Sequence, residues 1–134
     1  MTDHQTAATK ATVQRWLAAV NANDLDALVA CFEPDGSWQN VPNAPAVGHA
    51  AIRAMLAPIF ERSERVVWDI VTEAYAPGRA WLERVDRFVI DGTEHAVRCN
   101  GVLEIGPDSG LITELRDYVD LAEWRSRTTS VLLS

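Results

Sequence analysis

The sequence predicts a single α+β domain that spans residues 1–134. Two observations support this class: apolar residues recur at helical spacing in the first half, and β-branched and aromatic residues dominate four stretches of the second half. Helices that precede a run of strands indicate α+β rather than alternating βαβ units, so a doubly wound nucleotide-binding fold is not expected. A chain of 134 residues buries about two-thirds of its unfolded surface, so one core can also enclose a pocket.

Three helices are expected in the first half. The first is predicted by the helical spacing of Val13, Trp16, Leu17 and Val20. A second, short helix would start at a cap on Asn23 or Asp24 and run through Leu25, Leu28, Val29 and Phe32. A third, from Ala50 to Glu61, is indicated by Ile52, Met55, Leu56, Ile59 and Phe60. Between the second and third helices we expect a short strand from Trp38 to Val41, because Pro42 disfavours helix in the residue before it.

The second half is predicted to be an antiparallel meander. Its four strands are expected near 66–75, 79–90, 95–105 and 111–120, separated by the turn sequences PG, DG and GPDSG. A final turn or two of helix, LAEWRSR, and an apolar tail close the chain.

Side-chain alternation along these strands turns three charges inward. Arg84 and Asp86 share a face with Leu82, Phe88 and Ile90. Asp117 likewise shares a mostly apolar face, formed by Leu111, Thr113, Leu115 and Val119. An inward charge costs several kcal/mol unless it is paired, so the three groups are expected to meet. The residues alone leave two interpretations open, a structural ion-pair network and a catalytic site.

Composition and charge exclude several function classes. The net charge of -7, with Lys10 as the sole lysine, argues against nucleic-acid binding, which depends on clustered basic residues. No apolar run approaches the roughly 20 residues of a membrane span, and the polar start does not resemble a secretory signal, so a cytoplasmic protein is expected. The three histidines lack HExxH spacing, and the two cysteines are far apart, so neither a metal nor a cofactor is expected.

Three segments resemble the limonene-1,2-epoxide hydrolase family: WQNVPNAPAVG from Trp38 to Gly48, LERVDRF from Leu82 to Phe88, and LRDYVDL from Leu115 to Leu121. The resemblance extends from about Val13 to Trp124 and includes the order and separation of these motifs. It implies a nuclear-transport-factor-like or SnoaL-like fold, in which the N-terminal helices pack in the concavity of a strongly curved, mixed or antiparallel sheet that forms a cone-like barrel.

The resemblance also implies a role for each motif. Arg84 would bridge Asp86 and Asp117; Asp117 would act as the base and a protonated Asp86 as the acid. Asn40 would help to hold the attacking water. Trp38 stands where the family usually has a tyrosine, and an indole can only donate a hydrogen bond. Two consequences are open: Asn40 and Asp117 hold the water with a looser third contact, which we expect, or this branch of the family has an altered activity.

The expected activity is addition of water to a small apolar epoxide, terpene-like or alicyclic, to give a vicinal diol in one step. Alternation and resemblance together predict that the substrate pocket is lined by Leu17, Val20, Ile59, Trp68, Phe88, Val97, Cys99, Val119 and Trp124. A cofactor-free isomerase, a polyketide cyclase-like enzyme and a non-catalytic ligand-binding protein remain alternatives on the same fold. The outward-facing Trp81, Val85 and Val89 predict a homodimer.

Overall fold

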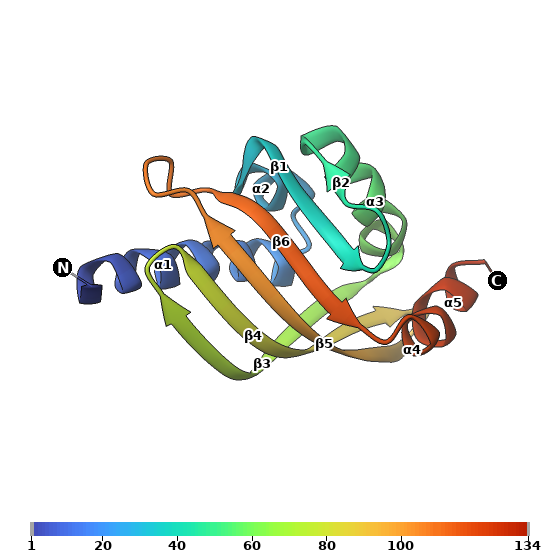
Figure 1. The fold of residues 1–134 in the computed structure, drawn as a ribbon. Helices are drawn as coiled ribbons and strands as arrows, with labels where there is room; N and C mark the ends of the chain where they lie inside the picture. The colour runs from blue at the N-terminus through green and yellow to red at the C-terminus, as the bar shows by residue number, and fades with distance from the viewer. Residues whose placement is uncertain (1, 134) are drawn as a thin grey trace.

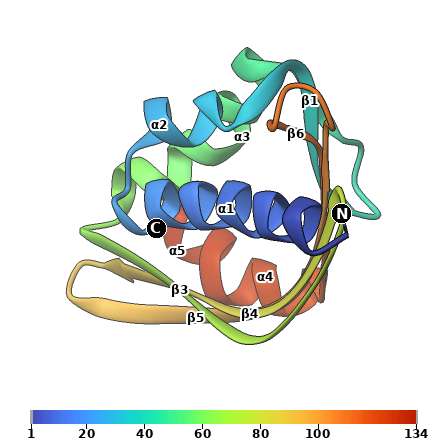
Figure 2. The same ribbon diagram turned by 90° about the vertical axis from the view of Figure 1, so that its left-hand side faces the viewer.

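The computed structural model describes residues 2–133, in which a six-stranded sheet curls around the N-terminal helix (Figure 1). Figure 2 shows α1 (Thr2–Asn21) running inside the curve of the sheet, with α2 (Leu25–Ala30) and α3 (His49–Arg62) at one open edge. The expected α+β class, with helices in the concavity of a strongly curved sheet, is confirmed. No helix among the described residues is both long enough and apolar enough to cross a membrane.

The helices begin and end close to the expected positions, with one correction. Of the two predicted caps of α2, Asn23 and Asp24, the structure shows Asp24, whose side chain accepts a hydrogen bond of 3.0 Å from the backbone N–H of Ala27. The prediction that Phe32 belongs to this helix is wrong: α2 ends at Ala30, and Phe32 is the first residue of β1. Phe32 pairs there with Ile112 and is fully buried, so sheet pairing overrides the helical spacing.

The sheet is mixed, with the strand order β2-β1-β6-β5-β4-β3. Its strands are β1 (Phe32–Val41), β2 (Ala46–Val47), β3 (Arg65–Ala76), β4 (Arg79–Ile90), β5 (Thr93–Ile105) and β6 (Ile112–Val119). The meander β3–β6 is antiparallel as predicted, whereas β1 runs parallel to β6. After β6 come α4 (Leu121–Trp124), a π-helical turn η1 (Arg125–Thr129) and α5 (Ser130–Leu132).

Alternation of buried and exposed residues follows the prediction on β4 and fails at the start of β6. On β4 every second residue from Ala80 to Ile90 is buried, including Arg84 and Asp86. On β6, Ile112 rather than Thr113 is buried, because the pairing with β5 shifts by one residue there. Thr113 is the extra residue of this β-bulge, so it does not share the face of Leu115 and Asp117.

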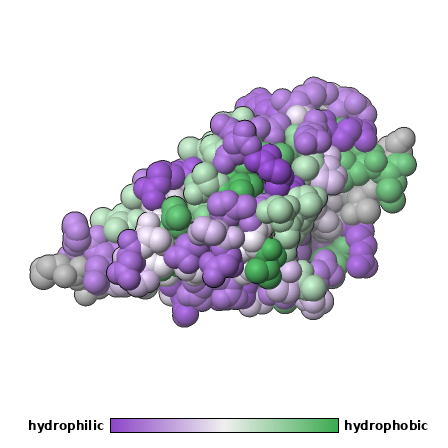
Figure 3. Space-filling model, turned by 90° about the horizontal axis from the view of Figure 1, so that it is seen from above, coloured by the Kyte–Doolittle hydropathy of each residue, from purple (hydrophilic) through white to green (hydrophobic). Residues whose placement is uncertain are grey.

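The core lies between the sheet and the helices. Trp16, Leu28, Ile52 and Phe60 from the three helices are among the fully buried side chains of this core. The face seen in Figure 3 carries hydrophilic residues with small apolar areas between them. On the outer face of the sheet Trp81 is 41% exposed.

Candidate active site

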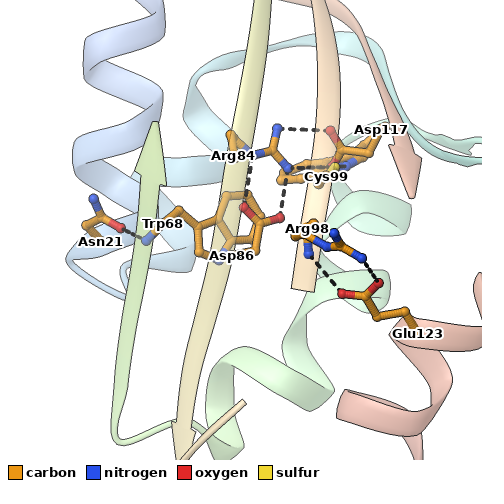
Figure 4. A network of polar contacts seen from close by, with 9 residues as sticks. Asn21, Trp68, Arg84, Asp86, Arg98, Cys99, Asp117 and Glu123 are labelled. Carbon is orange, nitrogen blue, oxygen red and sulfur yellow. Dashed lines mark hydrogen bonds and ion pairs between the residues drawn. The ribbon is translucent and has the colours of Figure 1, made fainter. Parts of the chain in front are cut away.

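A single buried arginine joins the two inward carboxylates, as Figure 4 shows. Arg84 donates to Asp86 through Nε and Nη2, both at 2.9 Å, and to Asp117 through Nη1 and Nη2, both at 3.0 Å. Both contacts are therefore two-point ion pairs, which fix direction as well as distance. The three residues, predicted separately from alternation, form one cluster.

The remaining neighbours of Arg84 are apolar or weakly polar. Its guanidinium lies 4.7 Å from the ring centre of Trp68 and 5.4 Å from that of Trp16, so it is attracted to an indole of β3 and another of α1. Nη2 also donates to the Sγ atom of Cys99 at 3.3 Å. Trp16 is fully buried. These contacts leave Arg84 little freedom to move.

Burial and charge together set the protonation of the cluster. Burial alone would lower the pKa of Arg84, but Asp117 and Asp86 outweigh it and hold that pKa well above its usual value. Burial raises the pKa of Asp86 to about 6, against the opposing pull of Arg84 and with an added push from Asp117. Burial also raises the pKa of the Cys99 thiol, so this thiol is a poor nucleophile. Below about pH 6, Asp86 can therefore donate a proton.

The two carboxylates reach the wall of a cavity of about 330 Å³. This volume is at the small end of the range for ligand pockets. Seven of the predicted substrate residues line it: Ile59, Trp68, Phe88, Val97, Cys99, Val119 and Trp124. The cavity is thus mostly apolar, with its carboxylates gathered on the sheet side.

Leu17 and Val20 are not among the residues that line this cavity, which corrects that part of the prediction. Both belong to α1; Val20 is fully buried in the core, and the partly buried Leu17 packs against it. The apolar side of α1 therefore packs against core side chains at these two positions and not against the cavity. The spacing of apolar residues could not separate core positions from cavity-lining positions on this helix, because both surroundings are apolar.

Sequence reasoning missed five lining residues: Asn43, Ala44, Met55, Leu56 and Phe60. A signal for some of them was present, because Leu56 and Met55 lie three and four residues before Ile59 on the same helix, α3, and Phe60 lies four residues after Leu56. The loop residues Asn43 and Ala44 carry no comparable pattern.

Trp38 and Asn40 lie on β1 beside the base candidate. Asn40 is the parallel-strand partner of Asp117, and both line the cavity. The indole Nε1 of Trp38 donates to Oδ2 of Asp117 at 3.1 Å. Asp117 therefore accepts from three N–H groups, two of Arg84 and one of Trp38. The indole N–H is used on the carboxylate and is not free to hold a water.

Gly101 is a positioning residue that sequence reasoning did not identify. It lies on β5 opposite Asp117. A Cβ atom at this position would be 2.5 Å from Nη1 of Arg84 and 2.7 Å from Oδ1 of Asp117. The Arg84–Asp117 contact therefore occupies the space that any other side chain would need.

The residues that the structure describes include no group of three or more His, Cys, Asp or Glu side chains placed to hold a metal ion. The arrangement present can move protons: one carboxyl group with a raised pKa, one carboxylate paired with a fixed cation, and a half-buried amide beside it.

Residues 13–115 match the sequence family described as the SnoaL-like domain. The fold is also similar to three solved structures. A Mycobacterium tuberculosis protein described as an LEH-like epoxide hydrolase is 24% identical with a TM-score of 0.72, covering 96% of this chain and 94% of that chain. A putative polyketide cyclase from Xanthomonas campestris pv. campestris is 20% identical with a TM-score of 0.78, covering 92% and 98%.

The third is a hypothetical protein of ketosteroid isomerase-like fold from Catenulispora acidiphila, solved in complex with trimethylamine. It is 25% identical with a TM-score of 0.72, and the match covers 88% of this chain and 92% of that chain. At these identities the likeness establishes the shared fold.

Proposed function

This chain belongs to the SnoaL-like domain family, and from that premise we propose that it is an epoxide hydrolase of the limonene-1,2-epoxide hydrolase type. It would add water to a small apolar epoxide, terpene-like or alicyclic, and release a vicinal diol. The observation that carries this proposal is the Asp86–Arg84–Asp117 cluster, whose two carboxyl groups both reach one apolar cavity.

A purely structural ion-pair network is the first alternative to weigh. Such a network gains most when protein donors surround it on all sides, because an empty space beside a carboxylate leaves lone pairs without partners. Here Asp86 and Asp117 line a cavity, and burial raises the pKa of Asp86 to about 6. Perturbed carboxyl groups that face a cavity are typical of catalytic sites.

In the proposed reaction Asp117 takes a proton from water as the water oxygen bonds to an epoxide carbon. The bond between that carbon and the epoxide oxygen breaks, and Asp86 gives its proton to the departing oxygen. Asp117 ends protonated and Asp86 ionised, so one proton must pass back to Asp86 before the next turnover. Arg84 stabilises the charge of the pair before and after the step, because it donates two hydrogen bonds to each carboxyl group.

Asn40 and Asp117 are the proposed holders of the attacking water. An amide can both donate to and accept from a water, and Asn40 is the strand partner of Asp117 on the cavity wall. Trp38 acts on the base instead, since its N–H holds Oδ2 of Asp117 in place. The water thus has two protein partners, and the substrate itself or a second water would supply the third.

The Trp38 N–H donates to Asp117 and is not free to hold a water, which favours a second candidate function, a cofactor-free isomerisation. That reaction needs a base and a hydrogen-bond donor to an oxyanion but no bound water. Asp117 and protonated Asp86 could supply the two groups. The oxygen balance separates the candidates, because hydrolysis adds a solvent oxygen to the product and isomerisation does not.

The test is turnover of a panel of small epoxides and unsaturated ketones by the purified protein, with heavy-oxygen water. We expect labelled diols from the epoxides. In a single turnover with excess enzyme, the first diol should carry the label and the Asp117 carboxylate should not. Label that enters Asp117 first would indicate an ester intermediate and contradict the direct attack by water.

Two variants assign the roles. Asp117→Asn and Asp86→Asn should each lower turnover about a hundredfold or more, since each removes a proton-transfer group. Asp91→Asn is the matched control, because Asp91 is an exposed turn residue and the change in net charge is the same. If either active-site variant kept near-normal turnover with an intact fold, the assignment of acid and base would be wrong.

A further inference from the structure

The charged side chains on the cavity wall are all carboxylates, among the residues that the structure describes. Asp86 and Asp117 line the cavity, each with 5% of its side chain exposed. Arg84, the cation that pairs with them, has 0% of its side chain exposed and is not a lining residue. The acidic residues of the cluster therefore border the space, and its guanidinium does not.

The cluster carries a net negative charge once both carboxyl groups are ionised. Arg84 contributes one positive charge against two negative charges. The other side chains that contact it are Cys99 from β5, Trp16 from α1, Trp38 from β1 and Trp68 from β3. Cys99 is the titratable group in this set, and burial raises the pKa of its thiol, so it stays neutral. Among the described residues that line the cavity, no cation balances this charge.

The remaining wall is rich in aromatic rings. Five of them line the cavity: Trp38, Phe60, Trp68, Phe88 and Trp124. Adjacent rings meet at steep angles, for example 84° between Trp38 and Trp68 and 80° between Phe88 and Trp124, so ring faces and edges alternate around the space. The faces of such rings attract cations, most strongly where water is excluded.

We propose that this cavity binds small organic ammonium ions with apolar substituents, with the charged nitrogen beside Asp86 and Asp117 and the alkyl groups against the aromatic wall. A trialkylammonium group suits the site because it is weakly hydrated and offers apolar surface on all sides. The cavity of about 330 Å³ holds a ligand of that size, and the net charge of -7 attracts cations to the protein. The proposal goes beyond epoxide hydrolysis and does not require it.

The affinity should depend on pH in a defined direction. Below about pH 6 Asp86 is protonated, and the cluster of Asp86, Arg84 and Asp117 is neutral. Above it the cluster carries one negative charge. A quaternary ammonium has the same charge at every pH, so any change in its affinity reports the protein. Binding should therefore strengthen as the pH rises from about 5 to about 8, by up to roughly tenfold, because the ionised fraction of Asp86 rises by that factor.

The test compares choline with 3,3-dimethylbutan-1-ol, its neutral isostere, which differs by carbon in place of the charged nitrogen. Binding is measured by isothermal calorimetry and by the intrinsic fluorescence of the protein, since three tryptophans line the cavity. We expect choline to bind more tightly than the alcohol at about pH 8, and the preference to shrink towards about pH 5. Equal affinity for the two, or a preference that does not change with pH, would overturn the proposal.

Variants then locate the charge. Asp86→Asn should abolish the pH dependence of the preference, whereas Asp91→Asn, which makes the same change in net charge on an exposed turn, should leave it intact. A pH dependence of the preference that survives in Asp86→Asn would place the ammonium elsewhere. Epoxide turnover is measured separately, so a protein that discriminates between the two probes but opens no epoxide would refute the proposed function and leave the ammonium site standing.

Discussion

One added methyl group at position 101 is expected to disable the site while the fold survives. In Gly101→Ala the new Cβ would lie 2.5 Å from Nη1 of Arg84 and 2.7 Å from Oδ1 of Asp117. Ordinary contact begins at 3.4 Å, so Nη1 must retreat by about 0.9 Å or the strand must bend. The hydrogen bond between these two atoms is 3.0 Å long and would not survive such a shift.

The size of the effect follows from these distances. Overpacking a buried site costs about 1–3 kcal/mol, so Gly101→Ala should unfold at lower denaturant concentration but remain folded in buffer. A catalytic group misplaced by about 1 Å costs roughly a hundredfold in rate. We therefore expect kcat on a small epoxide to fall about a hundredfold, with a much smaller change in KM, because Gly101 is not among the residues that line the cavity.

The assay is steady-state turnover together with urea unfolding of the same preparation. The control is Asn100→Ala, a change on the same strand whose side chain is exposed on the opposite face. The pH profile provides a further readout, since a displaced Arg84 would alter the pKa of Asp86, whereas a general loss of stability would not. Gly101→Ala with turnover within a few-fold of the parent would refute the argument that the network needs this space.

Three further outcomes are expected. Burial raises the pKa of Asp86 from 3.8 to about 6. Protonation of Asp86 therefore contributes about 3 kcal/mol to the free energy of unfolding below about pH 4, and this contribution is lost as the pH rises through 6. Urea unfolding of the parent should show that fall relative to Asp86→Asn. Arg84→Lys cannot reproduce two two-point ion pairs, so we expect it to lose about 3–5 kcal/mol of unfolding free energy and most of its turnover, and a loss below 1 kcal/mol would count against the pairing argument. We also propose that the outer face of the sheet pairs two copies of the chain through Trp81; light scattering at micromolar concentration should find a dimer, and Trp81→Asp should yield monomers, whereas a monomeric parent would contradict this.

The inward charges were predictable from the sequence because alternation along a strand is a local property. The position of Arg84 and Asp86 two residues apart on β4 fixes a shared face wherever that strand lies in the sheet. The same reasoning succeeded for Asp117 and failed for Thr113 on the same strand, because Thr113 is the extra residue of a bulge. The position of a bulge depends on the pairing with the neighbouring strand, and the periodicity of a single strand does not describe that pairing.

The details of the site needed contacts between distant segments. The indole of Trp38 reaches Asp117 because β1 pairs in parallel with β6, a connection across most of the chain. Resemblance indicated that position 38 is functional, and the three-dimensional arrangement shows that the indole N–H donates a hydrogen bond to the Asp117 carboxylate. The close approach of Gly101 depends on the register of β5 against β4 and β6, so nothing in the local sequence NGVLEI distinguishes it from a turn residue or a weak point of the strand.

The sequence by itself determined the α+β class, a helix cap at Asn23 or Asp24, and the inward direction of Arg84, Asp86 and Asp117, because helical spacing, capping and strand alternation act over a few residues. Only the tertiary structure decided that these three side chains meet, that Gly101 leaves room for them, and that Val20 packs in the core and not on the cavity wall. The physical reason is that an apolar stripe or an inward charge indicates what kind of surroundings a residue needs, whereas strand register and the curvature of the sheet determine which residues form those surroundings.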